Sequence, residues 1–152
     1  MYDLNLPDSN FKITKEEGKT FIFDAFRKKK IVLTPEEWVR QHFIRYLVDY
    51  KLFPKSLIKV ESGLKYNKLP MRSDILVYDR SGNPLALVEC KAYNIKINAA
   101  TFAQVSKYNQ TIKAPYIMLT NGMQHYCCRI DFENETFDYL KTMPNYEELL
   151  SL

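Results

Sequence analysis

Three charged residues, Asp74, Glu89 and Lys91, stand at the ends of apolar runs and have side chains that could do chemistry together. Charged groups in buried strands are costly unless they are paired or bound to a metal. Two carboxylates and a backbone carbonyl, here that of Cys90, form a hard oxygen site that suits Mg²⁺ or Mn²⁺. Such an ion polarises a phosphodiester oxygen and lowers the pKa of a bound water, which the Lys91 ammonium could orient.

A structural interpretation of the same residues stands beside the chemical one. Asp74 and Lys91 would then form a cross-strand ion pair, and Glu89 would be solvated at a sheet edge. Taken without their surroundings, the three residues favour neither interpretation.

The turn between the two apolar runs decides whether the charges meet. Gly-Asn at positions 82–83 is a hairpin signal, so the flanking strands are expected to pair antiparallel. With a tight turn centred there, Asp74 lies opposite Lys91 and Leu76 lies opposite Glu89. Residues that lie opposite share a face, and strand side chains alternate, so the three charges converge on one face. A three-residue loop would shift the register by one and scatter them.

Two helices and a series of strands must position this group. Thr34 is a hydroxyl N-cap before Pro35, and apolar residues at 39, 43, 47 and 50 predict a helix from Pro35 to about Tyr50. Asn98 is an N-cap for a second helix that extends to about residue 113. Strands are expected at residues 57–61, 74–79, 85–91 and 116–120, a closing hairpin at 125–130 and 136–140, and a short helix at 146–150.

This order predicts an α/β (α+β) protein with a mixed central β-sheet flanked by helices. The 152 residues are the length of one domain, with a core at about 33–121, an amino-terminal arm at 1–32 and a carboxy-terminal hairpin at 122–152. Within the arm, residues 12–33 predict one or two edge strands with a basic turn at 27–30.

Composition excludes several classes of protein. No apolar run reaches 18 residues and the amino terminus has no signal region, so we expect no membrane span and a cytoplasmic location. Cys90, Cys127 and Cys128 form no CxxC pair, which argues for reduced, mostly buried thiols rather than zinc or disulfides. His42 and His125 have no HxH or HExxH context, and no phosphate-binding loop of an ATPase motor is present. The net charge of +4 is compatible with a polyanionic partner without demanding one.

Asp74, followed on the next strand by Glu89-x-Lys91, resembles the PD-(D/E)XK nuclease superfamily, with Ser73 in place of the usual proline. Gln104-x-x-x-Tyr108 resembles an element of the amino-terminal nuclease domain of type I restriction enzyme R subunits. Four stretches resemble small stand-alone proteins classed with that domain: LTPEEWVRQHF, RSDILVYD, LVECKA and TNGMQHYC. The resemblance covers roughly residues 21–131.

The resemblance implies a restriction-endonuclease-like core of order αβββαβ and assigns roles to residues. Asp74 and Glu89 would hold the metal and Lys91 would be the catalytic lysine. Glu36 would be the supporting acid of the first helix, with Glu37 as a competitor because a slip of one residue is open. Gln104 and Tyr108 lie one helical turn apart and would contact a phosphate or steady the lysine. Their alternative roles are a capping amide and a packed aromatic.

The implied activity is Mg²⁺-dependent (or Mn²⁺-dependent) endonucleolytic cleavage of DNA. DNA contacts are expected from basic residues, namely Arg72, Lys65, Lys68 and Lys28. The implied partners are DNA and either restriction-modification subunits or a separate helicase, and double-strand cleavage would favour a homodimer. Two alternatives stay open: a non-catalytic or partner-dependent nucleic-acid-binding module of the same fold, and a nuclease acting on RNA or branched DNA.

Overall fold

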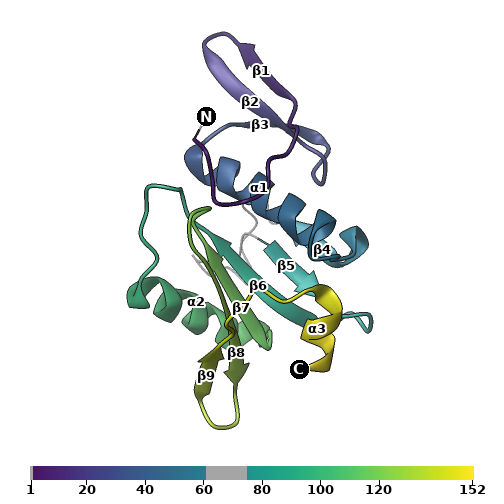
Figure 1. Cartoon of the computed structure of the whole chain (residues 1–152), viewed down its shortest axis with the longest axis vertical. Helices are drawn as coiled ribbons and strands as arrows, with labels where there is room; N and C mark the ends of the chain where they lie inside the picture. The colour runs from purple at the N-terminus through teal and green to yellow at the C-terminus, as the bar shows by residue number, and fades with distance from the viewer. Residues whose placement is uncertain (1, 61–74) are drawn as a thin grey trace.

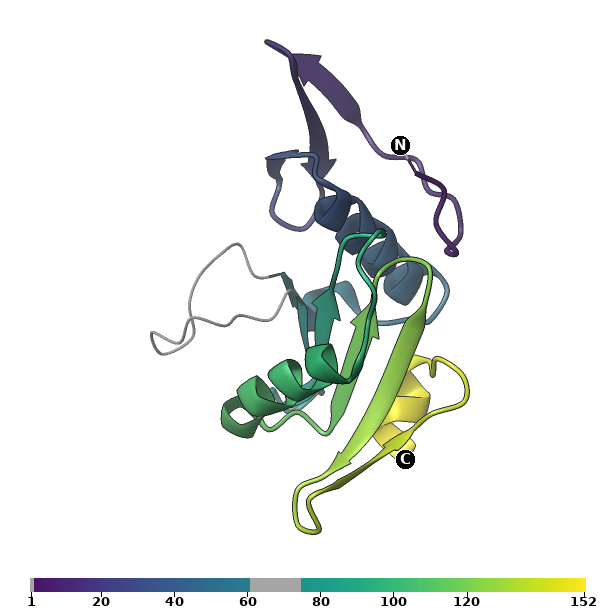
Figure 2. The same cartoon turned by 90° about the vertical axis from the view of Figure 1, so that its left-hand side faces the viewer.

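The computed structural model describes residues 2–60 and 75–152, which form two β-sheets and three α-helices. The three-stranded sheet comes first in the chain and projects beyond the amino-terminal end of the first helix (Figures 1 and 2). The six-stranded sheet and the helices form the body of the molecule (Figure 1). The mixed α+β class expected from the sequence is confirmed.

The projecting sheet consists of β1 (Ile13–Glu16), β2 (Lys19–Asp24) and β3 (Lys29–Val32), all antiparallel. The expectation of one or two edge strands here was wrong, because within the described chain these three strands pair with one another and form their own sheet. The β2–β3 turn is closed by Asp24, whose carboxylate accepts the backbone N–H groups of Phe26 and Arg27 at 2.8 and 3.0 Å.

The first helix, α1 (Pro35–Asp49), begins as predicted: the Thr34 hydroxyl accepts the Glu37 N–H at 3.1 Å. Val39, Phe43 and Leu47 of the predicted apolar stripe are fully buried. Tyr50, expected as the fourth member, is the C-cap instead and is 58% exposed. The stripe therefore ends with the helix.

The six-stranded sheet has the order β4-β5-β6-β7-β8-β9. A 3₁₀ turn (Lys55–Leu57) leads into it. Its strands and the two later helices are β4 (Ile58–Val60), β5 (Ile75–Tyr78), β6 (Pro84–Cys90), α2 (Ala99–Ile112), β7 (Tyr116–Thr120), β8 (His125–Asp131), β9 (Thr136–Tyr139) and α3 (Tyr146–Ser151). Strand β7 runs parallel to β6, because α2 carries the chain back across the sheet, and the other neighbours are antiparallel. Asn98 caps α2 through a capping box, as predicted.

The register of the β5–β6 hairpin differs from the predicted one. Leu76 lies opposite Leu87, not Glu89, so the pairing is shifted by two residues and carries a bulge at Val77/Tyr78. The physical reason is the turn: the Asp79 carboxylate accepts the N–H groups of Ser81 and Asn83, both at 2.9 Å, which closes a longer loop than a two-residue turn. A shift of two preserves the alternation, so Leu76 and Leu87 still share a face.

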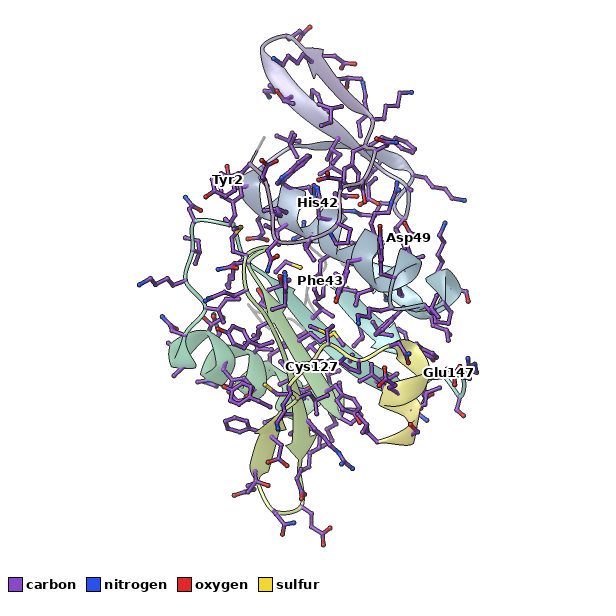
Figure 3. All side chains as sticks on the ribbon, in the orientation of Figure 1. Tyr2, His42, Phe43, Asp49, Cys127 and Glu147 are labelled. Atoms are coloured by element: carbon purple, nitrogen blue, oxygen red, sulfur yellow. The ribbon has the colours of Figure 1, made fainter. Side chains whose placement is uncertain are left out.

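Each face of the sheet is covered by a helix (Figures 1 and 2). On one face, Val39, Phe43 and Leu47 of α1 pack against Val88 and other strand residues, and Figure 3 labels Phe43 in this layer. On the other face, the α2 residues Val105 and Tyr108 pack against Leu76, Leu87, Ile117 and Leu119. Central strand β6 is therefore buried on both sides from Leu85 to Val88.

Cys90, Cys127 and Cys128 are buried free thiols, as predicted. Over residues 2–60 and 75–152, no helix combines the length and the apolar character needed to cross a membrane.

Candidate functional site

Glu89 and Lys91 lie at the carboxyl end of β6, between β5 and β7. The Lys91 ammonium is 3.5 Å from the Glu89 carboxylate, and their side chains are 28% and 18% exposed. The Lys91 N–H donates to the carbonyl of Thr120 at 2.8 Å, which extends the parallel pairing one residue past the strand. The backbone of this end is thus fixed by the sheet, while the two charged groups reach solvent.

The remaining strand residues predicted for the site are only partly described. Asp74 lies outside the described residues, as do Arg72, Lys65 and Lys68. Cys90 is fully buried within β6, on the α1 face. In the described part of the chain, no three His, Cys, Asp or Glu side chains come together as a metal-binding group.

The two candidate acids of α1 have different surroundings. Glu37 is buried: its carboxylate accepts two bonds from Arg27, at 2.8 and 3.0 Å, and one from Arg40 at 2.7 Å. Gln41 donates a further bond to it at 3.1 Å. The Glu36 side chain is 45% exposed, and its contacts include a bond from Arg40 at 3.0 Å. Glu37 is therefore held inside an ion network, and Glu36 is the more accessible carboxylate of the pair.

The same network ties α1 to the projecting sheet. Arg27 bridges Glu37 and the fully buried Asp24, to which its Nε also donates. Burial alone would raise the pKa of Asp24, but the hydrogen bonds and the charge of Arg27 outweigh it and hold that pKa below its usual value. Five charged side chains, from Asp24, Arg27, Glu36, Glu37 and Arg40, thus join the β2–β3 turn to the first turns of the helix.

Gln104 and Tyr108 lie on α2, one turn apart, as predicted. Gln104 is exposed, whereas Tyr108 is 4% exposed and packs with Leu76, Leu87 and Leu119. Glu89 is two residues beyond Leu87 and therefore projects from the same face of the sheet. Tyr108 and Glu89 therefore lie on the same side of the six-stranded sheet, and Tyr108 is buried there by its packing against these leucines.

Both histidines have structural contacts. His125 Nδ1 is 2.8 Å from the Thr120 hydroxyl and its Nε2 is 2.8 Å from the Asn5 carbonyl, and burial lowers its pKa. His42 Nδ1 lies 2.8 Å from the Trp38 carbonyl, inside a cluster with Phe11 and Trp38, and burial likewise lowers its pKa. Both imidazole rings are therefore held in place by backbone carbonyls and neighbouring side chains.

The amino-terminal segment lies beside the site, which sequence reasoning missed. Tyr2 stacks on Tyr93, two residues beyond Lys91, with ring centroids 4.4 Å apart and planes at 7°. The Tyr2 carbonyl also accepts the indole N–H of Trp38 at 2.7 Å. No local pattern could have indicated a contact between segments so far apart in the sequence.

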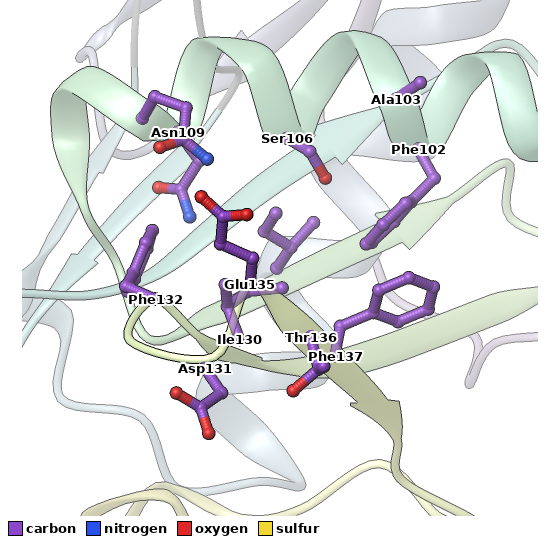
Figure 4. A pocket seen from close by; sticks show the side chains of 12 residues that line it. Phe102, Ala103, Ser106, Asn109, Ile130, Asp131, Phe132, Glu135, Thr136 and Phe137 are labelled. Carbon is purple, nitrogen blue, oxygen red and sulfur yellow. The ribbon is translucent and has the colours of Figure 1, made fainter.

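A pocket of about 430 Å³ lies elsewhere, between α2 and the β8–β9 turn (Figure 4). Phe102, Ser106, Glu135 and Phe137 are among its lining residues, and none of the residues predicted for catalysis belongs to it. Lys28, predicted to contact DNA, is exposed in the β2–β3 turn with a positive φ of 54°.

Comparisons with known proteins give a family. The family described as "Type I restriction enzyme R protein N terminus (HSDR_N)" matches residues 35–144, which is well over half of the chain. A solved fragment described as an HsdR subunit of a type I restriction enzyme from Vibrio vulnificus YJ016 is 22% identical, with a TM-score of 0.41. That match covers 62% of this chain and 18% of the other, so this chain corresponds to less than a fifth of that structure. No curated protein matches the chain. On the family match, the chain belongs to the family of type I restriction enzyme R protein N-terminal domains.

Proposed function

We propose that this chain is a metal-dependent nuclease module of the PD-(D/E)XK type that hydrolyses phosphodiester bonds in DNA. The observation that carries the proposal is the Glu89–Lys91 pair at the carboxyl end of a central strand, in a chain of this restriction-enzyme family. The order α1, β4, β5, β6, α2 and β7 among the described residues supports the proposal of a restriction-endonuclease-like core.

The chemistry of the donors fits a hard divalent cation. Glu89 offers a carboxylate that is partly open to solvent, and Asp74 and the Cys90 carbonyl would add oxygen donors of the kind Mg²⁺ and Mn²⁺ prefer. Of the two acids on α1, Glu36 is the better candidate for a supporting role because Glu37 is engaged by two guanidinium groups. A bound Mg²⁺ would supply Lewis-acid polarisation of the phosphodiester and a lower pKa for a water molecule.

The residues of the chain then have distinct tasks. Lys91 carries a positive charge that stabilises negative charge as it develops on the phosphate and orients the attacking water. Glu89, 3.5 Å away, positions that ammonium and would also be a ligand of the cation. Gln104, exposed on α2, can reach a bound phosphate, and Tyr108 fixes the helix against β6, which carries Glu89.

Plasmid cleavage with Mg²⁺ or Mn²⁺ tests the proposal directly. We expect nicking or cutting by the wild type and loss of at least about a hundredfold in rate for Glu89→Gln, Lys91→Ala and Asp74→Ala. Lys55→Ala, which removes an exposed lysine near β4, is the matched control and should cleave normally. Equal activity of Lys91→Ala and the control would refute the assignment, since contaminating nuclease would then explain the cleavage.

Binding measured without metal separates the alternatives. Fluorescence anisotropy with labelled DNA in EDTA should give similar affinity for the wild type and Lys91→Ala if the lysine acts in chemistry. DNA binding without cleavage under any metal would indicate a binding module, and cleavage of RNA in preference to DNA would indicate a different substrate.

A further inference from the structure

The two faces of the projecting sheet differ in burial along β2, although Ile13, which lies opposite Ile22, is itself 43% exposed. Along β2, Ile22 and Asp24 are fully buried, whereas Phe21 and Phe23 point the other way. Val32, 48% exposed, lies opposite Phe21, and Lys30 lies opposite Phe23. We call the side of the sheet that carries Thr14, Glu16, Lys19, Phe21, Phe23, Lys30 and Val32 the outer face.

The two phenyl rings of the outer face have no role in either hydrophobic core. Phe23 is 40% exposed and Phe21 is half-buried, and within the described residues neither ring belongs to the two core clusters in which α1 and α2 pack. A pair of rings on an open sheet face costs free energy in water. Their exposure therefore calls for a partner that covers them.

Positive charge surrounds these rings. Residues 12–32 contain seven Lys and Arg against three Asp and Glu, a net charge of +4 that equals that of the whole chain. On the outer face, the Lys30 ammonium lies 5.6 Å from the Phe21 ring centroid and pairs with Glu16 at 2.5 Å. Both partners of that pair are about half exposed, so a stronger anion can replace the carboxylate at little cost.

Aromatic rings set among lysines on a sheet match the chemistry of a single-stranded nucleic acid. Phosphates are bound by ammonium groups, and nucleobases stack on phenyl rings only when they are unpaired, because pairing hides their faces inside a duplex. An anionic surface without flat aromatic groups would use the lysines and leave the rings uncovered.

We propose that the outer face binds single-stranded DNA, with unpaired bases stacked on Phe21 and Phe23. The phosphates are held by Lys19 and Lys30 of that face and by Lys12, whose backbone carbonyl is bonded to the Phe23 N–H at its edge. The inference rests on the proposed nuclease function for the choice of DNA, and adds a second surface that selects unpaired strands. Arg27 and the buried network join this sheet to α1, so a strand bound there is held in a fixed relation to the body of the molecule.

Binding of labelled oligo(dT) in EDTA, followed by anisotropy, is the test. We expect Phe21→Ala and Phe23→Ala each to weaken binding about tenfold, and Phe23→Trp to preserve it. Phe137→Ala is the matched control, because Phe137 is also an exposed strand phenylalanine at 45% and should leave binding unchanged. Thermal unfolding of each variant establishes that the sheet still folds.

The salt dependence tests the lysines separately. Replacing Lys12, Lys19 and Lys30 by Gln should reduce the slope of log affinity against log salt by about 2, given about 0.7 per phosphate contact on a single strand. Lys55, Lys107 and Lys141→Gln removes the same charge elsewhere and should leave the slope unchanged.

Three results would overturn the inference: unchanged affinity in both folded phenylalanine variants, tighter binding to duplex DNA or to oligo(U) than to oligo(dT), or binding only to phosphatidylserine vesicles. Failure of the nuclease proposal is distinguishable, because it appears as absent cleavage by a protein whose oligo(dT) binding still depends on Phe21 and Phe23.

Discussion

Replacing Glu37 by Ala should destabilise the fold far more than replacing its neighbour Glu36. The two residues are adjacent acids in the first turn of α1, so both substitutions remove the same favourable interaction with the helix dipole. They differ in burial and in partners. The Glu37 side chain is 5% exposed and accepts bonds from Arg27, Arg40 and Gln41, whereas that of Glu36 is 45% exposed and contacts Arg40 at 3.0 Å.

The magnitudes follow from these contacts. Removing one member of a buried ion pair costs about 3–5 kcal/mol, because the charge left behind is uncompensated. Here the lower end, about 3 kcal/mol, applies, since Arg27 keeps Asp24 and Arg40 keeps Glu36. A surface pair such as Glu36–Arg40 is worth about 0.5 kcal/mol. With an m-value of about 2 kcal/mol/M, the urea midpoint should fall by about 1.5 M for Glu37→Ala and about 0.25 M for Glu36→Ala.

Urea unfolding at pH 7 in EDTA measures both variants, with Trp38 fluorescence and circular dichroism as independent probes. Glu37→Gln keeps the shape and some hydrogen bonds and should fall between the two. Midpoints of Glu36→Ala and Glu37→Ala that agree within about 0.3 M would refute the reasoning. The Glu36→Ala variant also tests which glutamate is the supporting acid of the nuclease site. It should remain folded and yet cleave DNA more slowly than the wild type.

Three further outcomes are expected. Burial raises the pKa of Cys127 and Cys128 to about 12, so iodoacetamide at pH 8 should label neither in the folded chain and both in urea, as read by mass spectrometry. Burial lowers the pKa of His125. The stability that depends on its neutral form is therefore full above the unfolded pKa of about 6.5 and declines as the pH falls below that value. His125→Gln should flatten this decline in the free energy of unfolding, measured by urea titrations from pH 7 to 5. At Gly122, where φ is +85°, an added Cβ would lie 2.8 Å from a Leu4 methyl, whereas at Gly18, where φ is +79°, nothing lies within 4 Å of it. Gly122→Ala should therefore lower the melting temperature more than Gly18→Ala. Equal losses would show that backbone strain alone determines the effect.

The boundaries of elements were predictable where the signal is local. Thr34 before Pro35 and the Asn98 capping box specify their helix starts within a few residues, and the apolar strand runs are equally local. The hairpin register was not, because it depends on the Asp79 side chain taking two backbone N–H groups in competition with the expected Gly-Asn turn.

The candidate site was predictable only in part. Their spacing predicted that Glu89 and Lys91 share a face at the end of one strand, whereas their approach to 3.5 Å was not predicted. The difference between Glu36 and Glu37 could not be predicted, because it is made by Arg27, ten residues before Glu37, which reaches the helix from the turn of another sheet. The stacking of Tyr2 on Tyr93 likewise joins segments that no periodicity relates.

The parallel pairing of β6 with β7 has a consequence for the order in which the molecule assembles. The β5–β6 hairpin closes over a short loop, whereas β7 can join β6 only after α2 has crossed the sheet, which carries a larger loop-closure entropy. The Lys91 amide is bonded to Thr120, so it becomes protected only at that later step. The rate at which this single amide exchanges with deuterium therefore reports when the end of β6 is complete, before any substrate is present.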